Sequence, residues 1–250
     1  MNIDQEQLRI LERKQKKLVY EIRESIRKKD PAIQVIYLPN FPLSKKVDYI
    51  FITPEPSVRW AKNEKDAMIK IENGFRNFMF SKEDIIFHYC INKYLSDSYY
   101  ITDISKAAMN TKDALKYYSW IFPKWNNLLK EEIGIIGKKD CKIIAVGWKS
   151  KEYLDKIELA TKQILHYSPN AAKYRKCVPE KYPNEYKEFK KTISDEIILD
   201  FAYNFLNKYE KMVKGIGKWA IDNLDKNQVV LTESIKMLMF TYYKEFKEIK

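Results

Sequence analysis

The stretch that decides the fold is residues 47–57, Val-Asp-Tyr-Ile-Phe-Ile-Thr-Pro-Glu-Pro-Ser. Its first six residues are mostly β-branched or aromatic, which favours a buried strand. Pro54 and Pro56 cannot donate a backbone hydrogen bond to a sheet, so the strand must stop before them. The sequence therefore predicts a strand that ends in a tight turn carrying Glu55 and Ser57.

Short apolar segments of this kind recur along the chain, and segments with helical spacing separate them. Strands are expected near residues 34–38, 47–52, 99–102, 142–147 and 163–165. Helices are expected over residues 62–96, 111–136 and 149–159, with Pro123 marking a kink or a break. Short strands that alternate with helices predict an α/β fold, in which a short, mostly parallel sheet is flanked by helices.

Both ends of the chain have helical patterns. Apolar residues recur at helical spacing across residues 1–30, until Asp30 and Pro31 stop the helix. After about residue 192 the pattern is again entirely helical. We expect one α/β domain over residues 1–192, including the N-terminal helix, and a C-terminal helical extension over residues 193–250 packed on that core.

Polar side chains follow three of the expected strands. Glu55 and Ser57 follow the first, Asp103 follows the second, and His166 and Ser168 follow the last. In parallel α/β sheets, ligands bind beyond the carboxyl ends of the strands. We therefore expect Glu55, Asp103 and His166 to open onto one cleft.

The formal net charge of +12 favours a polyanionic partner, because basic side chains displace counterions from phosphates. The same excess of lysine also fits the Lys-, Ile-, Asn- and Tyr-rich composition that AT-rich coding produces. Charge alone therefore indicates nucleic acid without identifying it.

Nothing in the sequence indicates a metal, a cofactor or a membrane. The three cysteines, Cys90, Cys141 and Cys177, lie far apart and outside any Cys-x-x-Cys motif, and there are only two histidines. No apolar run reaches the roughly 18 residues that span a bilayer, and residues 1–6 lack the apolar core of a signal peptide. The sequence predicts a cytoplasmic protein, nucleoid-associated if prokaryotic, without a cofactor.

Three segments resemble motifs of the uracil-DNA glycosylase superfamily, and the likeness covers about residues 45–178. Residues 50–57, IFITPEPS, resemble the first motif, in which a strand enters a turn with a shared proline. Residues 99–106, YYITDISK, resemble the strand that ends in a base-reading Asn. Residues 163–175, QILHYSPNAAKYR, are similar to the His-Pro-Ser-Pro motif, and residues 142–147 resemble the buried strand that ends in Gly.

This resemblance implies a three-layer fold and a metal-free DNA glycosylase that hydrolyses the N-glycosidic bond of a flipped-out damaged or deaminated base. It implies that Glu55 stabilises the positive sugar and orients a water, while His166 stabilises the departing base. Asp103 and Ser57 would contact the base. An aromatic side chain, drawn from Phe75, Phe78 and Phe80, would stack on it.

Residues 166–191 are basic and rich in aromatic side chains, which suits phosphate contact and base stacking. The residues expected to contact DNA are Ser168, Lys173, Tyr174, Arg175 and Lys176. A solvated, lysine-rich helix face is the alternative reading of this segment. The expected partner is DNA, and the expected state is a monomer.

Three positions depart from the motifs: Thr53 replaces a Gly, Tyr167 a Pro and Asp103 an Asn. An ionised Asp accepts hydrogen bonds only, whereas uracil also needs a donor, so activity on uracil is expected to be weak or its base range broader. The alternative is a non-catalytic DNA- or protein-binding module on the same fold. Another α/β nucleotide enzyme is disfavoured because no phosphate-binding glycine motif occurs.

Overall fold

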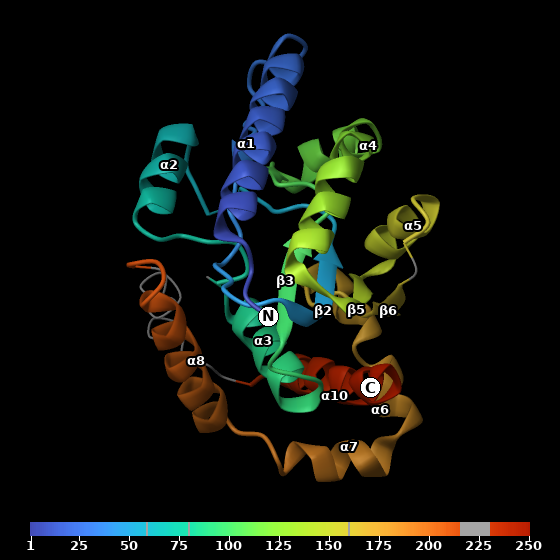
Figure 1. Ribbon diagram of the computed structural model, residues 1–250. Coiled ribbons are helices and arrows are strands. Elements are labelled where there is room, and N and C mark those ends of the chain that lie inside the picture. Colours follow the sequence, from blue (N-terminus) through green and yellow to red (C-terminus); the bar gives the residue numbers. More distant parts are fainter. Residues whose placement is uncertain (59, 80, 160, 216–230) are drawn as a thin grey trace.

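The computed structural model describes residues 1–58, 60–79, 81–159, 161–215 and 231–250. Its central sheet has four parallel strands in the order β3-β2-β5-β6 (Figure 1). These strands are β2 (Val47–Thr53), β3 (Tyr99–Asp103), β5 (Gly137–Val146) and β6 (Lys162–Ile164). The predicted α/β class, with a parallel sheet flanked by helices, is confirmed.

The strand β2 is the one predicted from the opening stretch, and it is central. It pairs in parallel with β3 on one side and with β5 on the other. The side chains of Ile50, Phe51 and Ile52 are almost fully buried, as a strand covered on both faces requires. Because its neighbours run parallel to it, the carboxyl ends of the strands meet at one edge, where Thr53 lies opposite Asp103.

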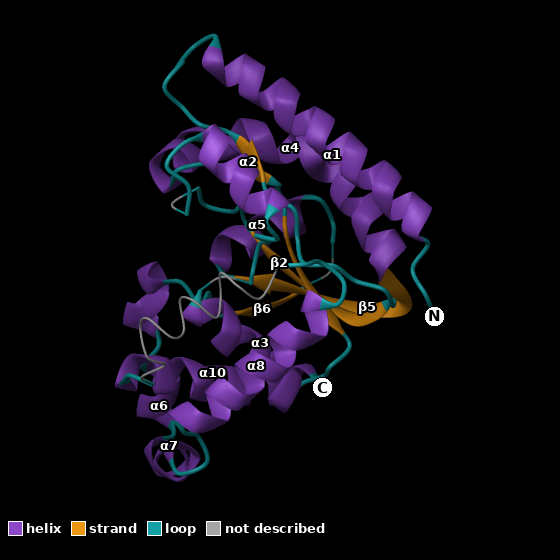
Figure 2. Cartoon of the chain, turned by 90° about the vertical axis from the view of Figure 1, so that its left-hand side faces the viewer, coloured by secondary structure: helices purple, strands orange, loops and turns teal. Residues whose placement is uncertain are grey.

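Helices cover both faces of this sheet (Figures 1 and 2). The N-terminal helix and a long central helix lie on one face, and two further helices lie on the other. The first pair is α1 (Gln5–Arg27) and α4 (Thr111–Ile136), and the second is α3 (Lys82–Tyr94) and α10 (Glu233–Ile249). Phe51 of β2 contacts Phe87 of α3 and Phe246 of α10 edge-on, at centroid distances of 5.5 and 5.9 Å.

The remaining elements connect or extend these layers. The helices are α2 (Glu64–Glu72), α5 (Trp148–Lys156), η1 (Pro169–Tyr174), α6 (Cys177–Lys181), α7 (Pro183–Lys190) and α8 (Asp195–Glu210). The strand expected over residues 34–38 is only β1 (Ile36–Tyr37), which pairs with β4 (Ala107–Ala108) in a separate antiparallel sheet. No described helix is both long and apolar enough to cross a membrane.

The helix α4 runs unbroken through Pro123, so a break at this position is wrong. A proline inside a helix removes one backbone hydrogen bond and costs about 3 kcal/mol. Ile121, Phe122 and Trp125 are buried on either side of it. Burial of these large side chains offsets the lost bond and keeps both halves of the helix in place.

The described C-terminal residues belong to the same apolar core as the sheet. Phe205 of α8 packs on His88 of α3 at a centroid distance of 4.4 Å. Phe246 of α10 is completely buried and lies beneath the central strand. The C-terminal helix therefore completes one of the two layers that cover the sheet.

We predict that Phe246→Ala lowers the free energy of unfolding by about 3–5 kcal/mol, the usual cost of a cavity in place of a buried phenyl ring. Urea denaturation of the full chain measures this loss. The matched control is Ile197→Ala, since Ile197 of α8 is 42% exposed and its truncation should change stability by less than about 0.5 kcal/mol. An equally small loss of unfolding free energy in both variants would show that α10 is peripheral.

Candidate functional site

A cavity of about 920 Å³ opens at the carboxyl edge of the sheet. Glu55, Asp103 and His166, which follow three different strands, all line it. Ser57 and Ser168 line it as well. The structure thus brings together the polar residues that sequence analysis expected to share a cleft.

The topology of the sheet places the cavity there. The chain leaves β2 toward β3 on one side and leaves β5 toward β6 on the other. The connections after the adjacent strands β2 and β5 therefore diverge, and a crevice opens between them. Residues 53–57 after β2 and 146–149 after β5 form two of its walls.

Glu55 is held across this crevice by a residue that sequence analysis missed. Both carboxylate oxygens accept hydrogen bonds of 2.9 Å from the Nζ of Lys149, in the first turn of α5. Burial raises the pKa of Glu55, and the charge and hydrogen bonds of Lys149 oppose this rise. A signal was present, because a lysine in the first turn of a helix opposes the helix dipole and so points to an acidic partner.

Asp103 is fully buried at the end of β3. Its carboxyl group accepts hydrogen bonds from the Thr53 hydroxyl and from the side-chain amide of Asn77. Burial raises its pKa to about 7, Glu55 adds to the rise, and Lys106 opposes it. At neutral pH the group therefore populates both the protonated and the ionised form. Asn77 also lines the cavity, but its loop has no periodic pattern from which its position could have been predicted.

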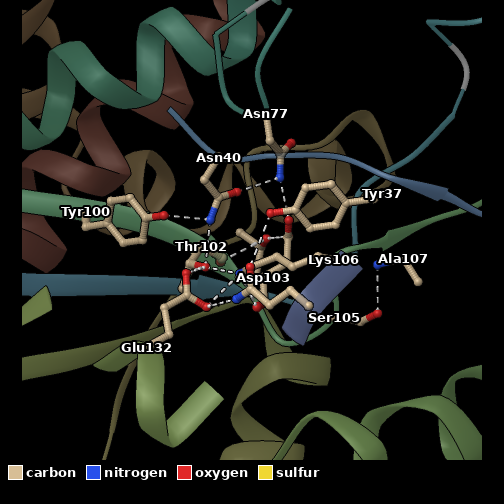
Figure 3. Close-up of polar contacts among 12 residues, drawn as sticks. Tyr37, Asn40, Asn77, Tyr100, Thr102, Asp103, Ser105, Lys106, Ala107 and Glu132 are labelled. Atoms are coloured by element: carbon tan, nitrogen blue, oxygen red, sulfur yellow. Dashed lines mark hydrogen bonds and ion pairs between the residues drawn. The ribbon is translucent and has the colours of Figure 1, made fainter. Parts of the chain in front are cut away.

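A buried polar network holds the end of β3 and Asp103 in place (Figure 3). Lys106 Nζ lies 3.0 Å from a carboxylate oxygen of Glu132 in α4 and donates to the backbone oxygen of Asp103 at 3.0 Å. The Thr102 hydroxyl donates to the other oxygen of Glu132 at 2.8 Å. Asn40 donates to Thr102 and accepts from Asn77. The position of Asp103 is therefore set by both the sheet and α4.

His166 lies in the cavity wall as a neutral ring. Burial and, less strongly, the charge of Lys149 lower its pKa to about 4. Its Nδ1 accepts a hydrogen bond of 3.0 Å from the backbone N–H of Ser168, so the single ring proton is on Nε2. The imidazole stacks on Tyr167 at 5.0 Å, and Tyr167 stacks on Phe87 at 5.1 Å.

Gly147 allows the imidazole to lie this close to the end of β5. Its φ of +83° is in the left-handed region, which glycine adopts without strain. A Cβ at this position would be 3.1 Å from the Cβ of His166. A side chain there would strain the backbone and force the histidine to shift by a few tenths of an ångström.

The C-terminal helix holds the turn that carries His166. Glu245 accepts from the backbone N–H of Leu165 at 3.2 Å, and the Tyr242 hydroxyl donates to its carbonyl at 2.8 Å. Burial raises the pKa of Glu245 to about 8. Sequence analysis could not link α10 to the site, because the contacts join residues about 80 positions apart.

Arg175, which sequence analysis expected to contact DNA, is engaged within the protein. Its side chain is buried, and the guanidinium donates to the backbone oxygens of Tyr167 and Ser168 and to the hydroxyl of Ser234. These bonds consume donors that a phosphate would need. Arg175 instead ties the turn after β6 to α10.

Lys173 and Lys176, which were expected to contact DNA, are exposed, and Tyr174 lines the cavity. The Nζ of Lys173 lies 4.9 Å from the centre of the Tyr174 ring. Lys176 forms an ion pair of 3.7 Å with Glu180. The segment therefore has an aromatic side chain at the cavity and an exposed face with an ion pair.

The aromatic candidates for base stacking lie in different surroundings. Phe75 lies in a small second core, stacked on Trp60 at 4.2 Å, and is not among the residues that line the cavity. Phe78 lines the cavity at a positive φ of 63°, and its carbonyl accepts a hydrogen bond of 2.9 Å from Nε2 of His88. Phe80 lies outside the described residues.

Among the described residues, no group of three or more His, Cys, Asp or Glu side chains is arranged to hold a metal ion. Comparison with known proteins identifies no relative: no family model matches the chain, and neither does any curated protein or solved structure.

We predict that Asp103→Asn removes a pH dependence from folding. Because the pKa rises from 3.8 unfolded to about 7 folded, the native state binds more protons between these values, and stability falls as the pH rises through about 7. The Asn amide can donate to Thr53 and accept from Asn77. The variant should gain about 2–4 kcal/mol relative to the parent between pH 5 and pH 8.

Urea denaturation at both pH values measures this gain. Asp155→Asn is the matched control, because Asp155 is exposed on α5, and this variant should track the parent at both pH values. Parallel pH profiles for the parent and Asp103→Asn would show that Asp103 stays ionised in the folded protein.

Proposed function

We propose that this protein is a divergent DNA glycosylase of the uracil-DNA glycosylase superfamily, with the three-layer fold of that superfamily. It binds a flipped-out damaged or deaminated base and hydrolyses its N-glycosidic bond. The observation that carries the proposal is the meeting of Glu55 and His166 in one cavity at the switch point of the sheet. They come from the first and third of the three motif segments.

The size and walls of the cavity support a nucleoside as ligand. Its volume of about 920 Å³ is in the usual range for small-molecule sites, about 300–1,000 Å³. Phe78 and Tyr167 supply apolar and aromatic wall, and a flat base is recognised by such surfaces together with a few polar groups. Asp103 and Asn77 supply polar groups beside Phe78.

Glu55 is suited to the sugar side of the reaction. As the C1′–N bond breaks, its electron pair leaves with the base and positive charge develops on the sugar. An ionised Glu55 stabilises that charge and accepts a proton from the water whose oxygen bonds to C1′. Lys149 supports this role, since its charge favours the ionised carboxylate in spite of burial.

His166 is suited to the base side. Its Nδ1 is occupied by the N–H of Ser168, so Nε2–H is the donor that remains for the base. With a pKa of about 4, the ring stays neutral throughout the physiological range. It can therefore stabilise negative charge on the departing base by donating a hydrogen bond without requiring acid.

One observation favours the second candidate, a non-catalytic binding module on the same fold. Both oxygens of Glu55 are engaged by Lys149. If this ion pair persists with DNA bound, the carboxylate cannot serve the sugar or the water. Base-release assays decide between the two functions.

We predict that Glu55→Gln and His166→Ala each slow base release by about 10²–10³-fold, because each removes a group that stabilises transition-state charge. Single-turnover assays on oligonucleotides containing uracil, hypoxanthine, xanthine or mismatched thymine measure the rates. Glu152→Gln, which alters an exposed carboxylate of α5, is the matched control and should match the parent. Absence of base release from every substrate, with DNA binding retained, would favour the binding module.

We also predict how Asp103 affects the choice of base. Protonated Asp103 both donates and accepts, as uracil requires, whereas the ionised form only accepts. Uracil release by the parent should therefore be weak at pH 8 and increase toward pH 6.5, with Asp103→Asn more active than the parent at pH 8. Strong, exclusive uracil release that is insensitive to both changes would exclude this role.

A further inference from the structure

Three large apolar side chains stand exposed at the mouth of the cavity. Leu115 of α4 is 58% exposed, Trp148 of α5 is 67% exposed, and Tyr174 of η1 is 51% exposed. All three line the cavity, although they come from three separate elements. Large apolar groups left in water around a binding site mark a contact surface for a partner.

Some of the cations around this mouth are paired within the protein. Lys149 is paired with Glu55, and the guanidinium of Arg175 is buried. On the surface of α5, Lys151 pairs with Asp155 at 2.5 Å and Lys156 with Glu152 at 2.6 Å. Just before α6, Lys176 pairs with Glu180.

The exposed apolar side chains at the mouth favour one form of DNA over the other as a partner. A protein grips duplex DNA mainly through many lysine and arginine contacts to phosphates. Single strands are instead held by aromatic side chains on which successive unpaired bases stack, with a few cations along the backbone. Trp148 and Tyr174 supply the rings, and Lys173, above the ring of Tyr174, supplies a cation beside them.

Resting on the proposed function, we propose that the substrate is single-stranded DNA, and that bases next to the one in the cavity stack on Trp148 and Tyr174. An unpaired strand presents the faces of its bases freely. It also delivers a base to the cavity without the cost of opening a pair, which duplex DNA must meet. Stacking on the apolar rim adds to the phosphate contacts that exposed lysines such as Lys173 can make.

Fluorescence anisotropy with a labelled 15-nucleotide single strand, and with the same sequence as a duplex, tests the proposal on the full chain. The parent should bind the single strand more tightly. Trp148→Ala should weaken single-strand binding by about 5- to 100-fold, as loss of one stacked base predicts. Trp148→Phe should retain most of the affinity, whereas Trp148→Leu, apolar but not aromatic, should behave like the alanine variant.

The matched control is Trp120→Ala. Trp120 is a tryptophan of α4 that is 41% exposed but does not line the cavity, so its removal should leave affinity unchanged. Circular dichroism of each variant verifies the fold. Equal affinity for duplex and single strand, or equal effects of Trp148→Ala and Trp120→Ala, would overturn the proposal. So would self-association that depends on Trp148 without any binding of DNA.

Failure of this inference can be separated from failure of the proposed function. Base release by the parent, with single-strand affinity indifferent to Trp148, would refute the stacking surface and leave the hydrolase intact. Binding of single strands that depends on Trp148, without release of any base, would support the surface and refute the hydrolase.

Discussion

The ion pair between Lys106 and Glu132 is the interaction on which the site depends. The two residues are only 2% and 3% exposed, and their charged atoms are 3.0 Å apart. A charge can be buried only if it is paired and its remaining hydrogen-bonding capacity is satisfied, so each partner requires the other. Glu132 also accepts from Thr102 and from Gln15 of α1, which ties the end of β3 to both helices of that layer.

The network extends from this pair into the cavity. Thr102 is linked through Asn40 to Asn77, and Asn77 donates to Asp103. On the opposite face, α10 holds both backbone groups of Leu165 and so positions the turn of His166. The cavity wall is thus supported by polar contacts from both helical layers, while the apolar core provides the rest of the stability.

Burial shifts the pKa values of Glu55, Asp103 and His166 so that the neutral form of each is favoured. Neighbouring lysines change these three pKa values in different directions. Lys149 opposes the rise in the pKa of Glu55, and Lys106 opposes the rise in the pKa of Asp103. For His166, the same Lys149 reinforces the effect of burial. One cation therefore favours an anionic carboxylate and a neutral imidazole together, which is the combination that the proposed reaction requires.

Sequence alone determined the four strands of the central sheet and the polar residues that follow three of them. Both depend on local properties: β-branched runs, prolines that stop a ladder, and the shared direction of parallel strands. Only the tertiary structure decided how those residues are used. Arg175 is buried in backbone contacts, Phe75 packs in a separate core, and Lys149 pairs with Glu55 across 94 positions. Such contacts depend on which segments of the chain pack against each other. The periodicity of one segment shows which of its faces is buried, but not which residues of another segment will contact that face.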